Sequence, residues 1–226
     1  LEPLSSSQAV LSPDEQEVGV VLVDIGGGTT DVTIYSEGSI VHTSVLALGG
    51  NHLTHDIAIG LGAPLREAEE IKHKFGVAMA NMVEENEMID VPSVGGRNNR
   101  TMQKRVLASI IEDRFREIFE LIAHEIEKTH FHTLMASGVV ITGGTCIMSG
   151  ADRLASQVLN LPVRVGYPEN ISGLREMIYS PKYATSVGLV RYGITSNQGK
   201  LNFVGDDTNL FHKVSRRMKD WMQEFF

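Results

Sequence analysis

Three consecutive glycines, Gly26 to Gly28, separate two short apolar segments, Val18 to Ile25 and Val32 to Tyr35. Each segment is rich in β-branched residues and too short for a buried helix, which predicts two strands joined by a glycine turn. Glycine is costly in backbone entropy, so three in a row indicate a special requirement at this turn. Successive backbone N–H groups that are free of side chains can form a nest around an anion. We therefore predict that the turn binds phosphate.

The polar residues beside the glycines favour the same interpretation. Threonine hydroxyls can donate hydrogen bonds to phosphate oxygens. Carboxylates next to a phosphate require a cation between them, and Mg²⁺ held through water is the usual choice. The predicted phosphate and magnesium site has no direct protein ligand to the metal and comprises Asp24, Gly26, Gly27, Gly28, Thr29, Thr30 and Asp31. The alternative interpretation is a plain glycine hairpin whose aspartates cap the turn.

A second pair of glycines, Gly143 and Gly144, follows the apolar segment Val139 to Thr142. A strand that ends in two residues without side chains allows a flat base or a ribose to lie against its backbone. The alternative is an ordinary turn between a strand and a helix, although such a turn needs at most one glycine. We predict that this segment can hold a base or a ribose.

The remaining pattern predicts an α/β fold. Ile40 to Val45 is a third strand after a Glu37-Gly38 turn, and short joints between the first three strands predict an antiparallel meander. Apolar spacing, caps and glycine stops predict further helices and strands. The predicted helices are 51–59, 64–74, 107–126, 151–159 and 184–192, and the predicted strands are 139–141 and 162–165.

Composition excludes several classes of protein. The chain has 226 residues, 42% of them hydrophobic and 21% charged, as in globular proteins. Its apolar runs fall well short of the roughly 18 residues of a membrane-spanning helix, and it has no signal peptide. The single Cys146 excludes an intramolecular disulfide, and a net charge of −8 argues against a nucleic-acid partner. Because the sequence begins at Leu1, we expect a processed or truncated piece of a longer protein.

The last 16 residues differ in character from the rest. Residues 211–226 carry four basic and two acidic side chains. On a helical wheel their apolar side chains fall within an arc of about 140°. These predicted membrane-contacting residues are Phe211, Val214, Met218, Trp221, Met222, Phe225 and Phe226. Bulky apolar residues flanked by cations are typical of a helix that lies in the interface of an anionic membrane. The alternative is a terminal helix that docks on the body, but a polar linker over 194–209 argues against it.

These segments together resemble the FtsA family of bacterial actin-like cell-division proteins. The resemblance rests on 2–5, 24–31, 48–52, 68–72, 139–144 and 183–193, and it covers the second half of an FtsA. It implies the second half of an actin-like ATPase (RNase H-like) fold, in which a mixed sheet with an antiparallel meander is flanked by helices. The implied parts are a connector (1–17), a lower phosphate- and adenosine-binding subdomain (18–60 and 135–193), an inserted upper subdomain (61–134), a flexible linker (194–209) and an amphipathic membrane-targeting helix (210–226).

The resemblance also implies a function. An FtsA-like adaptor would bind ATP and Mg²⁺, self-assemble into an actin-like polymer and tether FtsZ filaments to the cytoplasmic face of the inner membrane at the septum, where later division proteins are recruited. Glu69 and Lys72, which share a helix face, align with a pair that reaches the ribose, although an ordinary surface ion pair is the alternative. Arg114 and Glu117 lie in the region that receives the C-terminal peptide of FtsZ, and a pair on the helix surface is again the alternative.

No catalytic residue is predicted, so we expect at most a weak ATPase, and an inactive one in isolation. Two other functions share the implied fold. One is a fragment of a phosphotransferase like the sugar or acetate kinases, which would need a catalytic carboxylate from another half and would have no use for residues 211–226. The other is a related actin-like protein of pilus assembly or of the rod-shape system.

Overall fold

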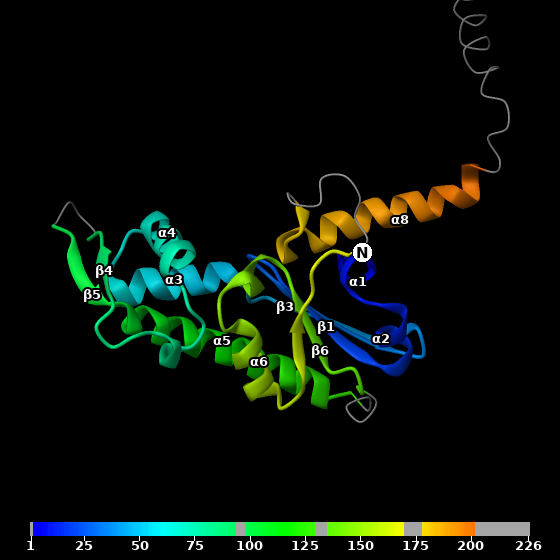
Figure 1. Cartoon of the computed structure of the whole chain (residues 1–226), viewed down its shortest axis with the longest axis horizontal. Coiled ribbons are helices and arrows are strands. Elements are labelled where there is room, and N and C mark those ends of the chain that lie inside the picture. Colours follow the sequence, from blue (N-terminus) through cyan, green and yellow to red (C-terminus); the bar gives the residue numbers. More distant parts are fainter. Residues whose placement is uncertain (1, 94–97, 130–134, 170–177, 202–226) are drawn as a thin grey trace, which may run out of the picture. The chain divides into compact units, whose positions relative to one another are not determined.

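The computed structural model describes residues 2–93, 98–129, 135–169 and 178–201. The chain divides into two compact units, Leu1–Leu189 and Val190–Phe226. Everything below concerns the first unit unless stated otherwise, and Figure 1 gives the labels of its helices and strands. Of the second unit, the structure describes only residues 190–201, which continue helix α8 (Ala184–Leu201).

A five-stranded sheet forms the centre of the first unit. Its strands lie in the order β3-β2-β1-β6-β7 and comprise β1 (Val20–Ile25), β2 (Thr30–Ser36), β3 (Ser39–Leu46), β6 (Val139–Thr142) and β7 (Val163–Val165). The pairs β1–β2 and β2–β3 are antiparallel, which confirms the predicted meander. The pairs β1–β6 and β6–β7 are parallel, so the sheet is mixed, as predicted.

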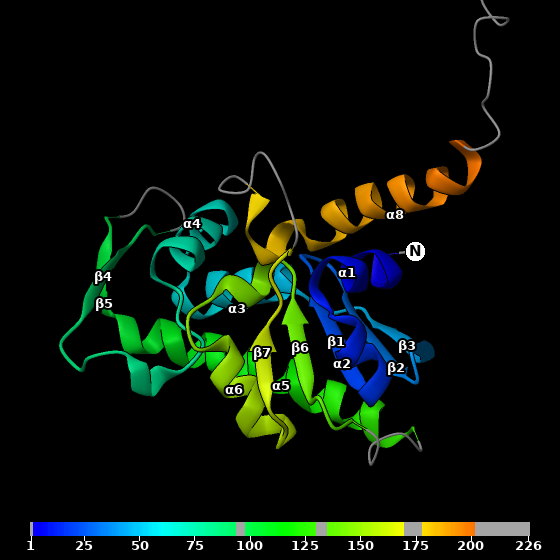
Figure 2. The same ribbon diagram turned by 45° about the vertical axis from the view of Figure 1, so that its right-hand side comes forward.

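Both faces of strand β1 are buried, which explains its continuous apolar run. Val21, Val23 and Ile25 face a core built with α5 (Lys104–Glu127) and α6 (Ala151–Leu159). Val20 and Leu22 alternate with them and pack with α1 (Glu2–Val10) and the start of α8 on the opposite face. Figure 2 shows the sheet between these two layers of helices.

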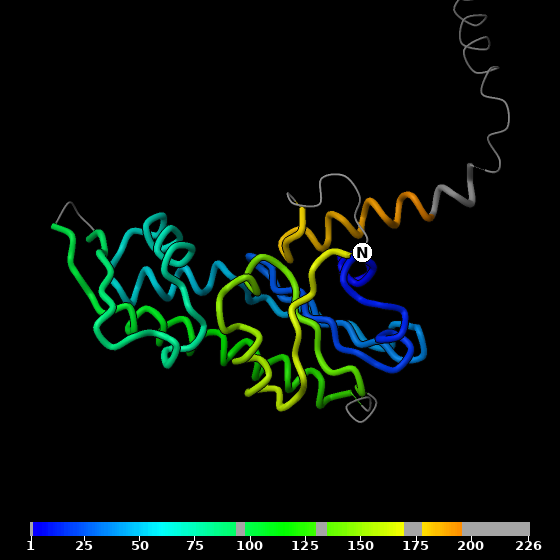
Figure 3. The backbone as a smooth tube through the Cα atoms, viewed as in Figure 1, coloured from blue at the N-terminus to red at the C-terminus, as the bar shows by residue number. Residues whose placement is uncertain are grey.

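The segment between β3 and α5 forms a helical pair and a small hairpin. It contains α3 (Gly50–Leu61), α4 (Leu65–Phe75), the short helix η1 (Ala80–Met82), β4 (Met88–Val91) and β5 (Arg100–Gln103). Strands β4 and β5 pair antiparallel in a sheet of their own, and the sequence did not predict them. Figure 3 traces the chain through this segment into α5. The proposed division into lower and upper subdomains stays a prediction.

The N-terminal residues are helical and not the expected polar connector. Helix α1 is followed by α2 (Pro13–Val18), which begins with a capping box between Ser12 and Glu15. The serines of α1 are buried, and the Ser7 hydroxyl lies 2.8 Å from the carbonyl oxygen of Leu4 and 2.6 Å from the Tyr35 hydroxyl. Internal hydrogen bonds therefore satisfy these polar groups and make a serine-rich segment compatible with burial.

Two other expectations about local structure need correction. Helix α8 continues through Leu201, so residues 194–201 are helical where a linker was expected. Isolated glycines such as Gly193 lower helix propensity without ending a helix. Residues 202–209 lie outside the described residues. Helix α3 is capped at Gly49 and not at Asn51, and the amide of Gly49 donates to Nδ1 of His52 at 3.2 Å.

Candidate functional site

The carbonyl groups of the glycine turn are held by the protein. The Gly26 amide donates to the Thr29 carbonyl at 2.9 Å and closes the turn. The Gly26 carbonyl accepts from the Gly50 amide and from the Thr145 hydroxyl, each at 2.9 Å. The Gly27 carbonyl accepts from the Asn51 amide at 2.7 Å. The first turn of α3 and the short helix η2 (Gly144–Ile147) thus fix the orientation of this loop.

The amide groups of the same turn point elsewhere. Within the described ranges, the amides of Gly27 and Gly28 donate no hydrogen bond, and both residues are exposed. A methyl group on Gly28 would meet no atom within 4 Å, so the space in front of it is open. Exposed amides beside pinned carbonyls are the arrangement that an anion nest requires.

The second glycine pair lies next to this turn because β1 and β6 are parallel neighbours. Asp24 and Thr142 are partners in their register, so both strands end at the same edge of the sheet. Gly143 has a φ of +92°, and a Cβ there would lie 2.5 Å from Oδ1 of Asp24. Only glycine allows the two turns to approach this closely. Gly143 is buried, whereas Gly144 is exposed.

A cleft of about 410 Å³ brings the predicted segments together. Gly27 from the glycine turn, Gly144 from the second pair, and Glu69 and Lys72 from α4 all line it. Several lining residues were not predicted as site residues: Gly50, Asn51, His73, Gly76, Thr145, Ile147, Met148, Ser149 and Lys182. The position of Asn51 directly after a glycine pair is a signal that could have identified it, whereas nothing in the sequence singles out Lys182.

The two threonines of the turn have different surroundings. Thr29 is exposed. Thr30 is fully buried, and its hydroxyl donates to the carbonyl oxygen of Leu48 at 2.8 Å. A hydroxyl has a single proton to donate, and that of Thr30 supports the loop before α3. It is therefore not offered to phosphate, contrary to the prediction.

Asp24 and Asp31 face each other across the β1–β2 ladder. Burial raises the pKa of Asp24, partly offset by hydrogen bonds from Thr185, at 3.0 Å, and from Ser6. Burial likewise raises the pKa of Asp31, and the negative charge of Asp24 adds to the effect. Within the described ranges neither carboxylate forms an ion pair. Two unneutralised carboxylates beside exposed amides fit a hydrated cation shared with phosphate.

Among the described residues, no cluster of metal ligands accompanies this pair of aspartates. In the part of the chain that the structure describes, no three His, Cys, Asp or Glu side chains gather as ligands for a metal. A cation at Asp24 and Asp31 would therefore take its remaining ligands from water and phosphate.

Glu69 and Lys72 form part of a tight network. The Lys72 ammonium lies 2.7 Å from Oε2 of Glu69, and Nε2 of His73 lies 2.9 Å from Oε1 of Glu69. The Thr54 hydroxyl also bonds Glu69. Burial raises the pKa of Glu69, but hydrogen bonds from Lys72 and Thr54 outweigh it, so the pKa lies below its ordinary value. Glu69 is therefore ionised at neutral pH.

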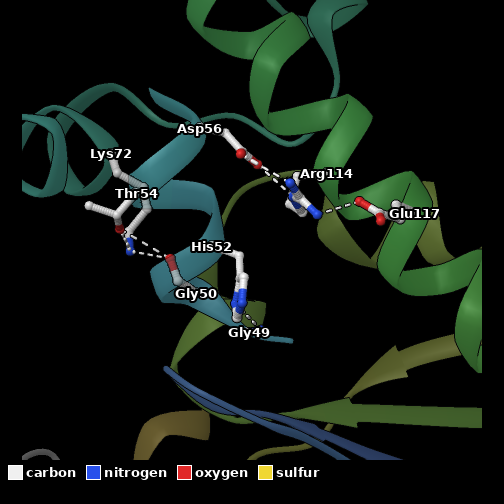
Figure 4. Close-up of polar contacts among 8 residues, drawn as sticks. All are labelled: Gly49, Gly50, His52, Thr54, Asp56, Lys72, Arg114 and Glu117. Atoms are coloured by element: carbon white, nitrogen blue, oxygen red, sulfur yellow. Dashed lines mark hydrogen bonds and ion pairs between the residues drawn. The ribbon is translucent and has the colours of Figure 1, made fainter. Parts of the chain in front are cut away.

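Arg114 is less available than the sequence suggested. Its Nε and Nη2 atoms bond the two carboxylate oxygens of Asp56 on α3 at 2.5 and 3.0 Å. Its third nitrogen bonds Glu117, one turn along α5 (Figure 4). Its side chain is 22% exposed, where an exposed arginine was expected. Arg114 is therefore held in a bidentate contact with Asp56, which is distant in sequence but lies opposite Arg114 on α3. The sequence had suggested a free cation at this position.

The predicted membrane-contacting residues, Phe211 to Phe226, lie outside the described residues. Among the helices that are described, none has the length and apolar character required to cross a bilayer.

The sequence model of the family described as cell division protein FtsA matches residues 21–188. The chain belongs to the FtsA family. It is 40% identical over 231 residues to the FtsA of Pseudomonas aeruginosa, covering 100% of this chain and 55% of that protein. The FtsA of Neisseria meningitidis is 44% identical over 191 residues, covering 84% and 46%, and that of Escherichia coli K12 is 39% identical over 231 residues, covering 99% and 55%. The chain thus spans about half the length of these FtsA relatives.

Solved structures with low sequence identity share the fold of this FtsA-family chain. MreB5 of Spiroplasma citri bound to ADP superposes with a TM-score of 0.71 at 20% identity, covering 89% of this chain and 61% of MreB5. The PilM–PilN type IV pilus biogenesis complex gives a TM-score of 0.62 at 18% identity, covering 86% and 52%. These similarities confirm the predicted actin-like fold.

Proposed function

We propose that this FtsA-family chain is the ATP-binding part of a cell-division adaptor. The observation that carries the proposal is that Gly27 and Gly28 are exposed and that, within the described residues, their amides donate no hydrogen bond. Gly27 lines a cleft together with Gly144 and Glu69. In the proposed complex the amides hold the phosphates, the adenosine lies along Gly144, and Glu69 accepts from the ribose hydroxyls.

Mg²⁺, when bound, would neutralise the phosphates and lie near Asp24 and Asp31. Burial raises the pKa of both carboxyl groups, and the charge of Asp24 raises that of Asp31 further. A nearby cation would therefore stabilise the ionised form of each. The described part of the chain offers no partnered nucleophile and base in the cleft, so we propose binding with at most weak hydrolysis. Nucleotide binding would then favour an assembling state of the adaptor.

Binding of labelled ADP in the presence of Mg²⁺ tests the nucleotide site. Gly27→Ala adds a methyl group in ordinary contact with the Asn51 side chain, 3.5 Å away, so the fold should persist while the nest is obstructed. We expect binding to weaken by about tenfold or more, since each donor aimed at a phosphate carries a charge-assisted bond. Gly193→Ala, whose methyl group would meet nothing within 4 Å, is the matched control. A wild-type chain that binds no ADP at millimolar concentration refutes the proposal.

The tether to FtsZ and to the membrane completes the proposed function. Membership of the FtsA family and the cationic, amphipathic pattern of residues 211–226 support it. Deletion of 211–226 should abolish co-sedimentation with vesicles of anionic lipid and leave ADP binding intact. Unchanged sedimentation would instead favour a helix that docks on the body.

The FtsZ contact is proposed at Arg114 and Glu117. Since Asp56 already holds the Arg114 guanidinium, an acidic FtsZ peptide would have to compete with Asp56 for it. Asp56→Asn should therefore strengthen binding of the FtsZ C-terminal peptide, and Arg114→Met should abolish it. Equal peptide binding by both variants and wild type would place the FtsZ contact elsewhere.

Membership of the FtsA family supports the division adaptor over the phosphotransferase and pilus-assembly alternatives. No contact in the described residues favours a sugar or acetate substrate, and the likeness to PilM extends to the fold alone.

A further inference from the structure

A hydroxyl group of helix α8 donates to Asp24, the carboxylate at the end of β1. Oγ1 of Thr185 lies 3.0 Å from Oδ2 of Asp24, although the two residues are 161 positions apart. Ser6 of α1 also bonds the Asp24 carboxyl group. Its hydroxyl lies 3.2 Å from the Glu2 carbonyl oxygen and 3.4 Å from that of Pro3, so three acceptors share one proton. Among the described residues, the Thr185 hydroxyl bonds Asp24 alone.

The second oxygen of Asp24 lies on the side of the glycine turns. A Cβ on Gly143 would lie 2.5 Å from Oδ1 of Asp24, at the edge where β1 and β6 both end. The terminal torsion of an aspartate is broad and roughly two-fold, so the side chain by itself does not fix where each oxygen points. The donor on Oδ2 therefore sets the orientation of the carboxylate plane.

Tight packing fixes the position of this donor. Gly188 lies one turn after Thr185, and a Cβ there would overlap the carbonyl oxygen of Ser5, so the backbones of α8 and α1 are in direct contact. Ala184, the first residue of α8, is buried. Threonine is also stiff about its first side-chain torsion. A rigid side chain on a firmly packed helix thus presents the hydroxyl to Asp24.

We infer that Thr185 is a positioning residue for the magnesium site. It holds Oδ2 of Asp24, so that Oδ1 remains at the sheet edge, where it can meet the hydration shell of the cation. Donors behind a metal-binding carboxylate commonly act in this way. This inference rests on the proposed function, because it requires Mg²⁺ to accompany the nucleotide beside Asp24. Thr185 itself would contact neither the metal nor the phosphates.

The dependence of ADP binding on Mg²⁺ tests this role. Thr185→Val keeps the shape of the side chain and removes the hydroxyl. The affinity for labelled ADP is measured in excess Mg²⁺ and in excess EDTA, and the ratio of the two affinities reports the contribution of the cation. We expect this ratio to fall about tenfold in Thr185→Val, with the affinity in EDTA unchanged. Thr195→Val removes a hydroxyl from an exposed residue of the same helix and is the matched control.

The conservative variant Thr185→Ser keeps the hydroxyl and should retain the wild-type ratio. A wild-type ratio in Thr185→Val would overturn the inference. An equal loss of ADP affinity in Mg²⁺ and in EDTA would also overturn it, because Thr185 would then support the cleft and not the cation site. If Thr185→Ser and Thr185→Val lose the same factor, the effect belongs to the methyl group and the inference is wrong.

Measurements on the wild-type chain separate this inference from the proposed function. ADP binding that is independent of Mg²⁺ would overturn the inference and leave the nucleotide site in place, whereas no ADP binding at all would overturn the proposed function. A crystal structure with ADP and Mg²⁺ covers the case in which the variants do not fold. The Thr185 hydroxyl should stay within hydrogen-bond distance of Oδ2 of Asp24. A Thr185 hydroxyl that instead bonds a phosphate or a metal-bound water would contradict the inference.

Discussion

Gly49 offers the sharpest test of how the glycine turn is supported. Its φ of −173° is extended backbone that any residue can adopt, so conformational strain does not explain a glycine here. The reason is contact, because a Cβ at Gly49 would lie 2.7 Å from the Gly26 oxygen and 2.8 Å from the Gly27 oxygen. Ordinary contact begins at 3.4 Å, so Gly49→Ala must push the turn and the start of α3 apart by about 0.6–0.7 Å.

The cost of that displacement can be bounded. Overpacking of a tight site usually destabilises a protein by about 1–3 kcal/mol. For a chain of this size each kcal/mol lowers the melting temperature by roughly 2–4 °C, so Gly49→Ala should melt roughly 2–12 °C below wild type. Circular dichroism during heating and urea titration measures both quantities. ADP binding should weaken as well, because the displaced carbonyls belong to the turn that presents the amides.

Gly28→Ala is the matched control for the stability measurement. Its added methyl group would meet no atom within 4 Å, and the loss of glycine freedom in the unfolded chain should leave stability unchanged or raise it by about 0.4–1 kcal/mol. Both substitutions replace glycine by alanine. Gly49→Ala should lower the free energy of unfolding, whereas Gly28→Ala should leave it unchanged or raise it. If Gly49→Ala unfolds within about 0.5 kcal/mol of wild type, the contact argument is wrong.

Three further predictions concern charged groups. The pKa of Asp31 is raised, chiefly by burial, so the ionisation of Asp31 opposes folding. Asp31→Asn should therefore raise the melting temperature of the nucleotide-free chain at pH 7.5. This gain should vanish below the ordinary aspartate pKa near 3.9. Equal gains at both pH values would contradict this sign. Arg114→Met and Asp56→Asn should each destabilise the chain and show a coupling of about 1 kcal/mol in a double-mutant cycle by urea unfolding; additive effects would mean that the bidentate pair is energetically silent. Burial raises the pKa of Glu15, but hydrogen bonds from Arg164, whose Nε and Nη2 bond its two oxygens at 2.8 Å, and from Ser12 together outweigh burial and lower it. The stability that Glu15 contributes is therefore present above the ordinary glutamate pKa and is lost as the pH falls through the lowered pKa of Glu15. Arg164→Met should make the loss of stability with falling pH less steep in that range. An unchanged acid transition would exclude this pair as its source.

The elements that carry a local pattern could be predicted from sequence. The meander, the two glycine turns and the amphipathic helix α5 each follow from periodicity, β-branched residues or glycine placement, and the structure has all of them. Helix α1 could not be predicted this way, because its serines are buried only once Tyr35 and the helix carbonyls provide their partners.

Long-range contacts limited the prediction of the site. The spacing of Glu69 and Lys72 predicted a shared helix face, and both side chains line the cleft, but Gly50 and Thr54, two of the acceptors around Lys72, come from α3. The same holds for Arg114, whose partner Asp56 is 58 residues away in the chain. Sequence patterns identify which residues can do chemistry, and the packing of two helices decides which of them stay available for it.

Three protein donors hold the carbonyls of Gly26 and Gly27 in the structure. A ligand that enters the cleft thus meets amides in their final orientation, and little loop entropy is lost on association. Affinity among variants of this turn should consequently vary through the lifetime of the complex, with nearly constant rates of capture. In the proposed nucleotide complex, the rate of nucleotide release would then depend on how strongly the first turn of α3 holds the peptide planes after Gly26 and Gly27.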